Sequence, residues 1–277
     1  MISHEFRQVD VFTAVPYAGN PVAVVHGADD LDDATMASFA RWTNLSETTF
    51  LLGPTAPEAD YRLRIFTPGG ELPFAGHPTL GSAHAWLAAG GTPKAGDIVQ
   101  ECGVGLVRIR RTGDRLAFAA PPLRRSGAVD DETLARIVAG LGVRAGDVVD
   151  AAWVDNGPGW AGILLSSPTL VAELSPVWSE LAGMDVGVAA IDTTPERPEL
   201  VVRAFAVGAG VTEDPVTGSL NAGLAQWLIG SGRLPASYLA RQGAAMRRDG
   251  HVYIEATGDD VWVGGDCVTC ISGDVTI

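Results

Sequence analysis

The chain has 277 residues, of which 47% are apolar and 19% charged, a composition typical of a globular protein long enough for two modest domains. Its net charge of −14 argues against nucleic acid or an anionic membrane surface as a general partner. No stretch approaches the roughly 18 continuous apolar residues of a membrane span, and residues 1–10 lack the features of a secretory signal.

Two scarce residue types restrict the possible cofactor chemistry. Three cysteines, Cys102, Cys267 and Cys270, are too few for a disulfide framework and fit a reducing cytoplasm. The Cys267–Cys270 pair has no second pair of ligands nearby in the sequence, so we expect no zinc site. Lys94, the only lysine, lies in a predicted turn, which is a poor position for the Schiff base of pyridoxal phosphate.

The first half of the chain is rich in predicted strands. Leu31, Met36, Phe39 and Trp42 recur at helical spacing and predict an amphipathic helix over residues 32–44. A second helix is predicted over 78–89, where Gly90 and Gly91 end it. Alternation of apolar residues predicts strands at 7–13, 22–26, 61–66, 98–101, 106–110 and 115–119, with another one beginning in the segment 45–52.

Pro121-Pro122 marks the predicted boundary between an N-terminal half, 1–120, and a C-terminal half, 121–277, whose last strand could return to the first half. The second half repeats the pattern of the first. Helices are predicted at 131–141, 168–173 and 215–229, and strands at 148–154, 160–165, 186–191, 200–206, 252–255 and 261–263. Strands and helices do not alternate strictly, so we expect an α+β fold rather than a doubly wound parallel sheet.

A short motif occurs twice, with an offset of 137 positions between residues 77–82 and 214–219 and of 139 positions between the preceding Arg-x-Phe sequences. Each copy has a polar residue, a proline, two further residues, Gly-Ser and an apolar helical run, and an Arg-x-Phe sequence lies shortly before it. Six matched features in the same order indicate an internal duplication rather than two unrelated helix starts. The matched pairs are His77 with Asp214, Pro78 with Pro215, Gly81 with Gly218, Ser82 with Ser219, Arg64 with Arg203 and Phe66 with Phe205.

The residue types of this motif are typical of a helix N-terminus. We expect Asp214, and less conventionally His77, at the N-cap, with the proline in the first helical position. Small residues in the first turn would let a ligand approach backbone N–H groups at the positive end of the helix dipole. Two such ends facing one cleft would bind a small molecule that carries a carboxylate.

With these motifs, the sequence resembles the PhzF-like (phenazine biosynthesis) family, which has the diaminopimelate epimerase fold. The resemblance implies two pseudo-symmetric halves, each a curved, mostly antiparallel sheet wrapped around a central helix, with the active site in the cleft between them. It also implies a homodimer and a reaction that needs no metal and no organic cofactor. The matching segments are 10–13 with 19–21, 45–50, 66–68 with 73–79, 213–219 and 242–243.

The resemblance also implies which residues form the site. Related epimerases and racemases use two cysteines at the two helix starts, but Ala75-Gly76-His77 and Asp214 occupy these places here, and none of the three cysteines is near either. In the PhzF branch a single glutamate carries the proton, and Glu47 is its match. Without the family, Glu47 would be interpreted as a solvated residue after a helix end.

The remaining candidates surround this glutamate in the proposed site. His77 would donate to a substrate carboxylate or an enolising carbonyl, and Asp214 would orient a substrate amine or hydroxyl, or hold His77. The candidate substrate-binding residues are Gly76, Gly218, Ser219 and Asn20. His84, two helical turns after His77, is either a supporting partner or a packing residue, and residues 156–158 are a candidate wall of the cleft.

The sequence therefore predicts a cytoplasmic, cofactor-independent isomerase that shifts a proton on a small carboxylate-bearing substrate, with Glu47 as general base and then acid. One alternative is a racemase, epimerase or dehydratase of a small amino or hydroxy acid. A second alternative is a non-catalytic small-molecule binding protein on the same scaffold.

Overall fold

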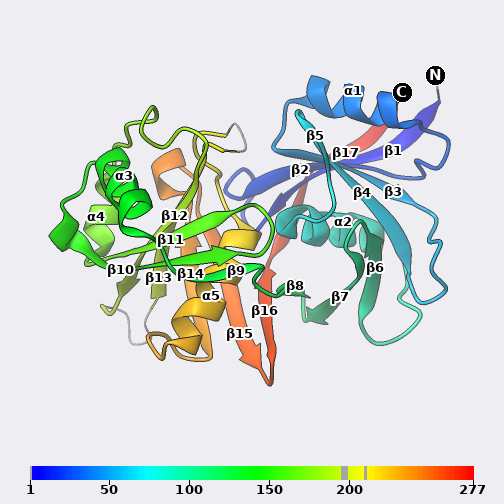
Figure 1. Ribbon diagram of the computed structural model, residues 1–277. Coiled ribbons are helices and arrows are strands. Elements are labelled where there is room, and N and C mark those ends of the chain that lie inside the picture. Colours follow the sequence, from blue (N-terminus) through cyan, green and yellow to red (C-terminus); the bar gives the residue numbers. More distant parts are fainter. Residues whose placement is uncertain (1, 195–198, 209–210) are drawn as a thin grey trace. The chain divides into compact units, whose positions relative to one another are not determined.

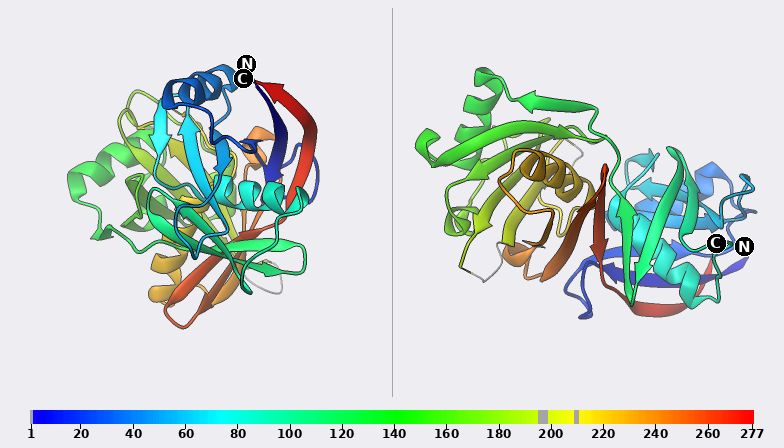
Figure 2. Two further views of the ribbon diagram at one scale, coloured as in Figure 1. Left: turned by 90° about the vertical axis from the view of Figure 1, so that its right-hand side faces the viewer. Right: turned by 90° about the horizontal axis from the view of Figure 1, so that it is seen from below.

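The computed structural model describes residues 2–194, 199–208 and 211–277, which form two compact units. The first consists of Met1–Ala119 with Gly264–Ile277, and the second of Ala120–Val263. Each unit is a curved, mostly antiparallel sheet accompanied by few helices (Figures 1 and 2). The architecture is therefore mixed, with more strand than helix, as the sequence predicts.

The described part of the first unit contains two helices. Its elements in chain order are β1 (Ser3–Val11), β2 (Asn20–Val25), α1 (Asp33–Thr43), β3 (Glu47–Leu52), β4 (Tyr61–Thr67), β5 (Gly70–Leu72), α2 (Gly76–Ala88), β6 (Ile98–Cys102), β7 (Gly105–Thr112), β8 (Arg115–Ala119) and β17 (Cys267–Thr276). Antiparallel pairs join β17 to β1, β1 to β2, β3 to β4, β4 to β5, β6 to β7 and β7 to β8. The pairs β2–β3 and β4–β6 are parallel, because α1 and α2 return the chain to the starting edge in these two connections.

Helix α2 is the central helix of the first unit. It is apolar on all sides, and its residues 76–83 are buried, which is typical of a helix enclosed by other elements. It contacts β1, β2, β3, β4, β8 and β17, so the curved sheet surrounds it. Helix α1 covers the other face, where Met36 packs in a cluster with Phe50 and Phe66.

Three α-helices lie within the described residues of the second unit. Its elements are β9 (Arg125–Ala128), α3 (Asp131–Leu141), β10 (Val148–Asp155), β11 (Trp160–Leu165), α4 (Pro168–Glu173), β12 (Asp185–Asp192), β13 (Glu199–Ala206), α5 (Gly218–Gly230), β14 (Ser237–Gln242), β15 (Gly250–Thr257) and β16 (Asp260–Gly265), with 3-10 turns at Ala145–Asp147 and Ala244–Met246.

Strand pairing in the second unit follows the same order as in the first. β10–β11, β12–β13 and β14–β15 are antiparallel, whereas β11–β12 and β13–β14 are parallel across α4 and α5. Helix α5, like α2, is apolar on all sides and contacts β10, β11 and β15. On the other face, Ile137 and Leu141 of α3 and Val171 of α4 pack against the sheet.

Several predicted element boundaries are wrong, and each has a local cause. β1 ends at Val11 instead of residue 13, because Phe12 has a φ of 66°, which takes the chain out of the extended conformation. The strands β5, β9 and β14 were not predicted individually, since they are short or lack alternation. Trp42, predicted on the buried face of the first helix, is 78% exposed and stacks on Phe39.

Candidate functional site

Glu47 is the first residue of β3 and follows a sharp change in chain direction. Helix α1 ends at Thr43, because its C-cap Asn44, three residues before Glu47, has a left-handed conformation (φ 55°). The parallel pairing with β2 then places Glu47 opposite Val22. The Glu47 side chain is only 15% exposed, and its Oε2 lies 3.3 Å from Nε2 of His77. The fold therefore brings together two of the three predicted catalytic residues.

His77 lies in the first turn of α2 rather than at its N-cap, so the predicted position is wrong. The helix begins at Gly76, and its N-cap is Ala75, whose extended backbone provides no side-chain cap. The imidazole is buried, and its Nδ1 lies 3.3 Å from the Asn20 Nδ2 atom. Burial lowers the His77 pKa from 6.5 to about 3, although a hydrogen bond with the Pro21 backbone opposes this shift.

A neutral imidazole has particular consequences for the contact with Glu47. At neutral pH the contact is not an ion pair, because burial keeps the His77 imidazole uncharged, and Oε2 and Nε2 are close without hydrogen-bond geometry between them. When the Asn20 amide donates to Nδ1, the single ring hydrogen is on Nε2. His77 therefore lies beside the Glu47 carboxyl group as an uncharged group.

Gly76 contributes backbone rather than side chain to this arrangement. It is buried, and it is the first residue of α2. The N–H groups of Gly76 and His77 precede the first helical hydrogen bond, which runs from Thr79 N to Ala75 O at 3.2 Å. Ser82, further along α2, shares a hydrogen bond of 2.9 Å with Thr49 of β3, so its hydroxyl belongs to the packing of the unit.

Asp214, in the second unit, is not the N-cap of α5 as predicted. Its N–H donates to Ala204 O of β13 at 2.9 Å, in an isolated β-bridge. This extended conformation keeps Pro215 out of the helix, which starts at Gly218 with Thr217 as its N-cap. The Thr217 hydroxyl lies 2.6 Å from Asp214 Oδ2 and donates to it.

Gly218 and Ser219 form the first turn of α5. Gly218 is buried and Ser219 is partly buried. The Ser219 hydroxyl accepts a hydrogen bond of 3.0 Å from the Trp160 indole, and its carbonyl accepts one of 2.8 Å from the Asn156 amide. The Ser219 oxygen is therefore held by β11 while its hydrogen can still be donated. Asn156, which is predicted to form a wall of the cleft, makes this hydrogen bond to the first turn of α5.

The two arginines of the repeated motif make equivalent contacts in their own units. Arg64 forms a bidentate pair with Glu71 at 2.8 and 2.6 Å, and Arg203 forms one with Glu213 at 2.9 and 2.8 Å. Each guanidinium also lies over the phenylalanine two positions later, at 5.1 and 5.0 Å from the ring centre. Both arginines therefore make structural contacts within their own units.

His84 and the cysteines lie apart from the residues described above. His84 Nε2 is 3.0 Å from the Thr269 hydroxyl of β17, and burial lowers the His84 pKa. The free cysteines are on β6 (Cys102) and β17 (Cys267 and Cys270). Across residues 2–194, 199–208 and 211–277, no group of three or more His, Cys, Asp or Glu side chains is placed to hold a metal ion. None of the helices in these ranges has both the length and the apolarity to cross a membrane.

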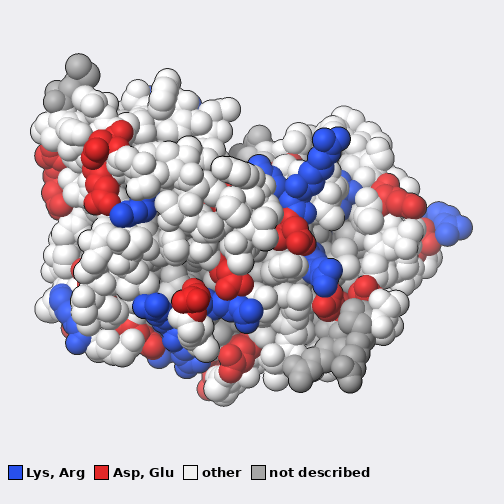
Figure 3. All heavy atoms as spheres, turned by 180° about the vertical axis from the view of Figure 1, so that it is seen from behind, with Lys and Arg blue, Asp and Glu red and all other residues white. Residues whose placement is uncertain are grey.

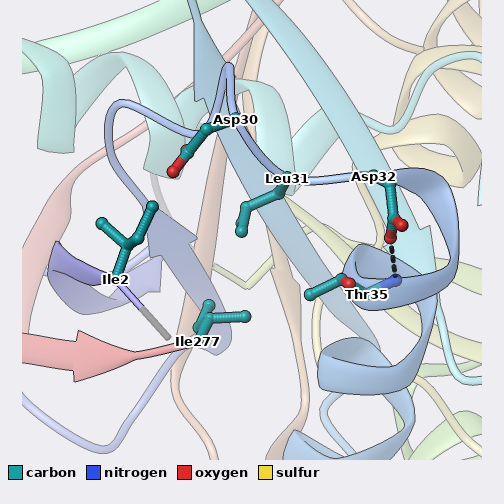
Figure 4. A pocket seen from close by; sticks show the side chains of 6 residues that line it. All are labelled: Ile2, Asp30, Leu31, Asp32, Thr35 and Ile277. Carbon is teal, nitrogen blue, oxygen red and sulfur yellow. Dashed lines mark hydrogen bonds between the residues drawn. The ribbon is translucent and has the colours of Figure 1, made fainter.

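The surface of the first unit has a hollow away from Glu47. It lies at the start of α1, where the Asp32 carboxylate accepts a hydrogen bond of 2.8 Å from Thr35 N and so caps the helix (Figure 4). Its lining residues are Ile2, Asp30, Leu31, Asp32, Thr35 and Ile277. On the face drawn in Figure 3, acidic and basic side chains are interspersed rather than segregated.

Two residues without a predicted role join the site in the second unit. Thr217 contacts Asp214, and Gln242 of β14 contacts both Thr217 and the Asp214 carbonyl. The sequence contained one signal for Gln242, its place in a segment that matches the family. Nothing in the sequence indicated these two partners, because they lie 25 and 28 positions away.

Comparisons with known proteins agree with this architecture. The chain is 36% identical to Antisense-enhancing sequence 1 of Schizosaccharomyces pombe over 99% of both chains. It is 32% identical to a trans-2,3-dihydro-3-hydroxyanthranilate isomerase of Pseudomonas aeruginosa, over 92% of this chain and 91% of that protein. Other relatives in bacteria are named uncharacterized isomerases.

Solved structures share the fold. A phenazine biosynthesis protein of the PhzF family from Enterococcus faecalis superposes with a TM-score of 0.83 at 24% identity, with full coverage of both chains. A hydroxyproline epimerase from Agrobacterium vitis superposes with a TM-score of 0.60 at 15% identity over 99% of this chain and 92% of that one, which fits an epimerase-like fold. The family model described as phenazine biosynthesis-like protein (PhzC-PhzF) matches residues 9–273, and this chain therefore belongs to the PhzF family.

Proposed function

We propose that this protein is an isomerase that moves a proton along a small carboxylate-bearing substrate without a cofactor. Glu47 takes the proton as a base and returns it as an acid. The observation that carries the proposal is the contact between the largely buried Glu47 carboxylate and His77 at the start of α2. Relatives named as isomerases support the same reaction class.

The proposed roles follow from the chemistry of the groups. A carboxylate can abstract a proton when it is held beside the carbon that loses it, and the uncharged imidazole of His77 lies 3.3 Å from the Glu47 carboxyl group. The N–H groups at the start of α2 would bind the substrate carboxylate, as helix N-termini bind anions. Asn20 contacts the His77 ring and would thereby help to hold the start of α2 in position to bind this carboxylate.

The second unit would contribute an equivalent set of groups. We propose that Asp214 accepts a hydrogen bond from a substrate amine or hydroxyl, while Gly218 and Ser219 donate from the start of α5. Matched Arg–Glu pairs, Arg–Phe contacts and strand order support a duplicated, pseudo-symmetric origin of the two units. We further propose that the protein forms a homodimer and is located in the cytoplasm.

Solvent deuterium exchange tests this function. The protein is incubated in D₂O with trans-2,3-dihydro-3-hydroxyanthranilate and a panel of small amino and hydroxy acids, and deuterium uptake is followed by NMR. We expect uptake at one carbon with a shifted double bond, and a loss of at least about 1000-fold in Glu47→Gln, because the amide cannot accept the proton. The matched control is Glu58→Gln, which changes an exposed glutamate of the same unit.

The alternatives give different results in the same experiment. Exchange that produces the mirror-image product without a bond shift would favour a racemase or epimerase. Tight binding of a metabolite without any exchange would favour a binding protein. Persistent exchange in Glu47→Gln would show that another group is the base.

A further inference from the structure

Gln242, the last residue of β14, makes four hydrogen bonds to residues that precede α5 or lie in its first turn. Its side chain is buried. Nε2 donates to Asp214 O at 3.0 Å and to Thr217 Oγ1 at 2.9 Å. Oε1 accepts from Thr217 N at 3.1 Å and from Asn221 Nδ2 at 2.9 Å. One amide therefore joins a strand, the residues before a helix and the first turn of that helix.

The chemistry of these groups fixes the direction of the hydrogen bonds. An amide nitrogen only donates, so the Thr217 oxygen is the acceptor in its contact with Gln242. The Thr217 hydroxyl has a single hydrogen, which is then directed to Asp214 Oδ2 at 2.6 Å. A chain of donors thus runs from Gln242 through Thr217 to the Asp214 carboxylate.

Asp214 is consequently held at three points. Its N–H is bound to β13, its carbonyl to Gln242 and its carboxylate to Thr217. If Asp214 were the N-cap of α5, its side chain would turn toward the N–H groups of the helix, and fewer of these three contacts would form. The bridge to Ala204 instead gives Asp214 an extended backbone beside the start of α5.

The first unit contains a related amide that lacks this connection. Gln100 of β6 donates to Thr79 Oγ1 in α2 at 3.0 Å, and it accepts from the Tyr61 hydroxyl at 3.1 Å. It therefore joins strand to helix in the same way and is equally buried. Its second partner is a tyrosine of β4 rather than a residue before the helix, so Gln100 provides a matched control for the structural effect of losing such an amide.

We infer that Gln242 is a positioning residue of the site, which acts through Thr217 to hold the Asp214 carboxylate in one orientation toward a hydrogen-bearing group of the substrate. The inference rests on the role proposed above for Asp214. Gln242 itself contacts no substrate in this scheme, and its contribution depends entirely on Asp214.

A double-mutant cycle tests this dependence. Gln242→Met removes the amide but keeps the length of the side chain, and it is made in the native protein and in Asp214→Asn. The readout is kcat/KM for the proton shift. We expect a loss of roughly 10- to 100-fold in the native background, as for a small displacement of a catalytic group. In Asp214→Asn the same change should cost less than about 3-fold, because the group it positions has already lost its function.

The matched variants separate positioning from stability. Gln100→Met should lower the unfolding temperature to a similar extent but leave kcat/KM within about 3-fold of the native value. Thr217→Val removes only the hydroxyl link, so it provides the same test if Gln242→Met does not fold. It should reproduce the activity loss, whereas Thr79→Val should not. Equal losses from Gln242→Met in both backgrounds would overturn the inference.

A second measurement does not depend on activity. If no compound in the panel is turned over, the proposed function fails, but hydrogen exchange still decides whether Gln242 and Thr217 hold Asp214. We expect Thr217→Val to raise the exchange rate of the Asp214 amide at least about 10-fold, since the segment loses a tether. Thr79→Val should leave that rate unchanged, and an unchanged rate in Thr217→Val would overturn the inference.

Discussion

The buried imidazole of His77 should make this protein less stable in mild acid. The folded protein excludes the proton until about pH 3, whereas the unfolded chain binds it near pH 6.5. Between these values the unfolded state binds more protons, so stability falls as the pH falls. The slope approaches about 1.4 kcal/mol per pH unit once the unfolded histidine is mostly protonated, and acidification from pH 7.5 to 5.0 should therefore cost about 2 kcal/mol through this residue.

His77→Gln isolates this contribution. Urea unfolding, followed by tryptophan fluorescence at pH 7.5 and 5.0, gives the free energy of unfolding of each variant by linear extrapolation. We expect the loss of stability between the two pH values to be about 2 kcal/mol smaller in His77→Gln than in the native protein. His251→Gln is the control, because this partly exposed histidine lies beside Asp249 at the surface.

Burial also lowers the pKa of His26 and His84, but both residues are retained in all variants, so their contributions cancel in the difference. Two outcomes would refute the reasoning. An unchanged pH dependence in His77→Gln would mean that the imidazole takes up its proton as easily in the folded as in the unfolded chain. A steeper dependence would mean that His77 is a cation paired with Glu47, since that pair would stabilise the folded state below pH 6.5.

Two further pairs of substitutions test the packing of the repeated elements by thermal unfolding. Arg203→Met should cost about 3 kcal/mol, because it strands the largely buried carboxylate of Glu213, whereas Arg64→Met, whose acidic partners are more exposed, should cost about 1 kcal/mol. Equal losses would contradict this assignment. Gly223→Ala should cost about 2 kcal/mol, since its Cβ would lie 2.3 Å from a backbone oxygen of β10. Gly230→Ala, which meets open space at the end of α5, should instead gain about 0.5 kcal/mol, and a neutral Gly223→Ala would refute the overlap.

Local sequence determined many of the elements. Helix α3 spans Asp131–Leu141 as predicted, because Asp130 caps its first turn and Gly142 adopts the left-handed conformation that ends it. Helix α4 likewise begins at Pro168 behind the Ser167 cap. The repeated motif was visible for the same reason, since capping residues, prolines and apolar runs act within a few positions of each other.

The sequence by itself also pointed to Glu47, His77 and Asp214, through motifs and a family resemblance. Only the tertiary structure decided how these residues are held. His77 reaches Glu47 across 30 positions, and Gln242 reaches Thr217 across 25. The predicted start of α5 is wrong because a hydrogen bond to Ala204, ten positions away on β13, outweighs the local preference of Asp214 for an N-cap. Local preferences set where helices and strands can form, but buried long-range hydrogen bonds set the orientation of the polar groups that could carry the chemistry.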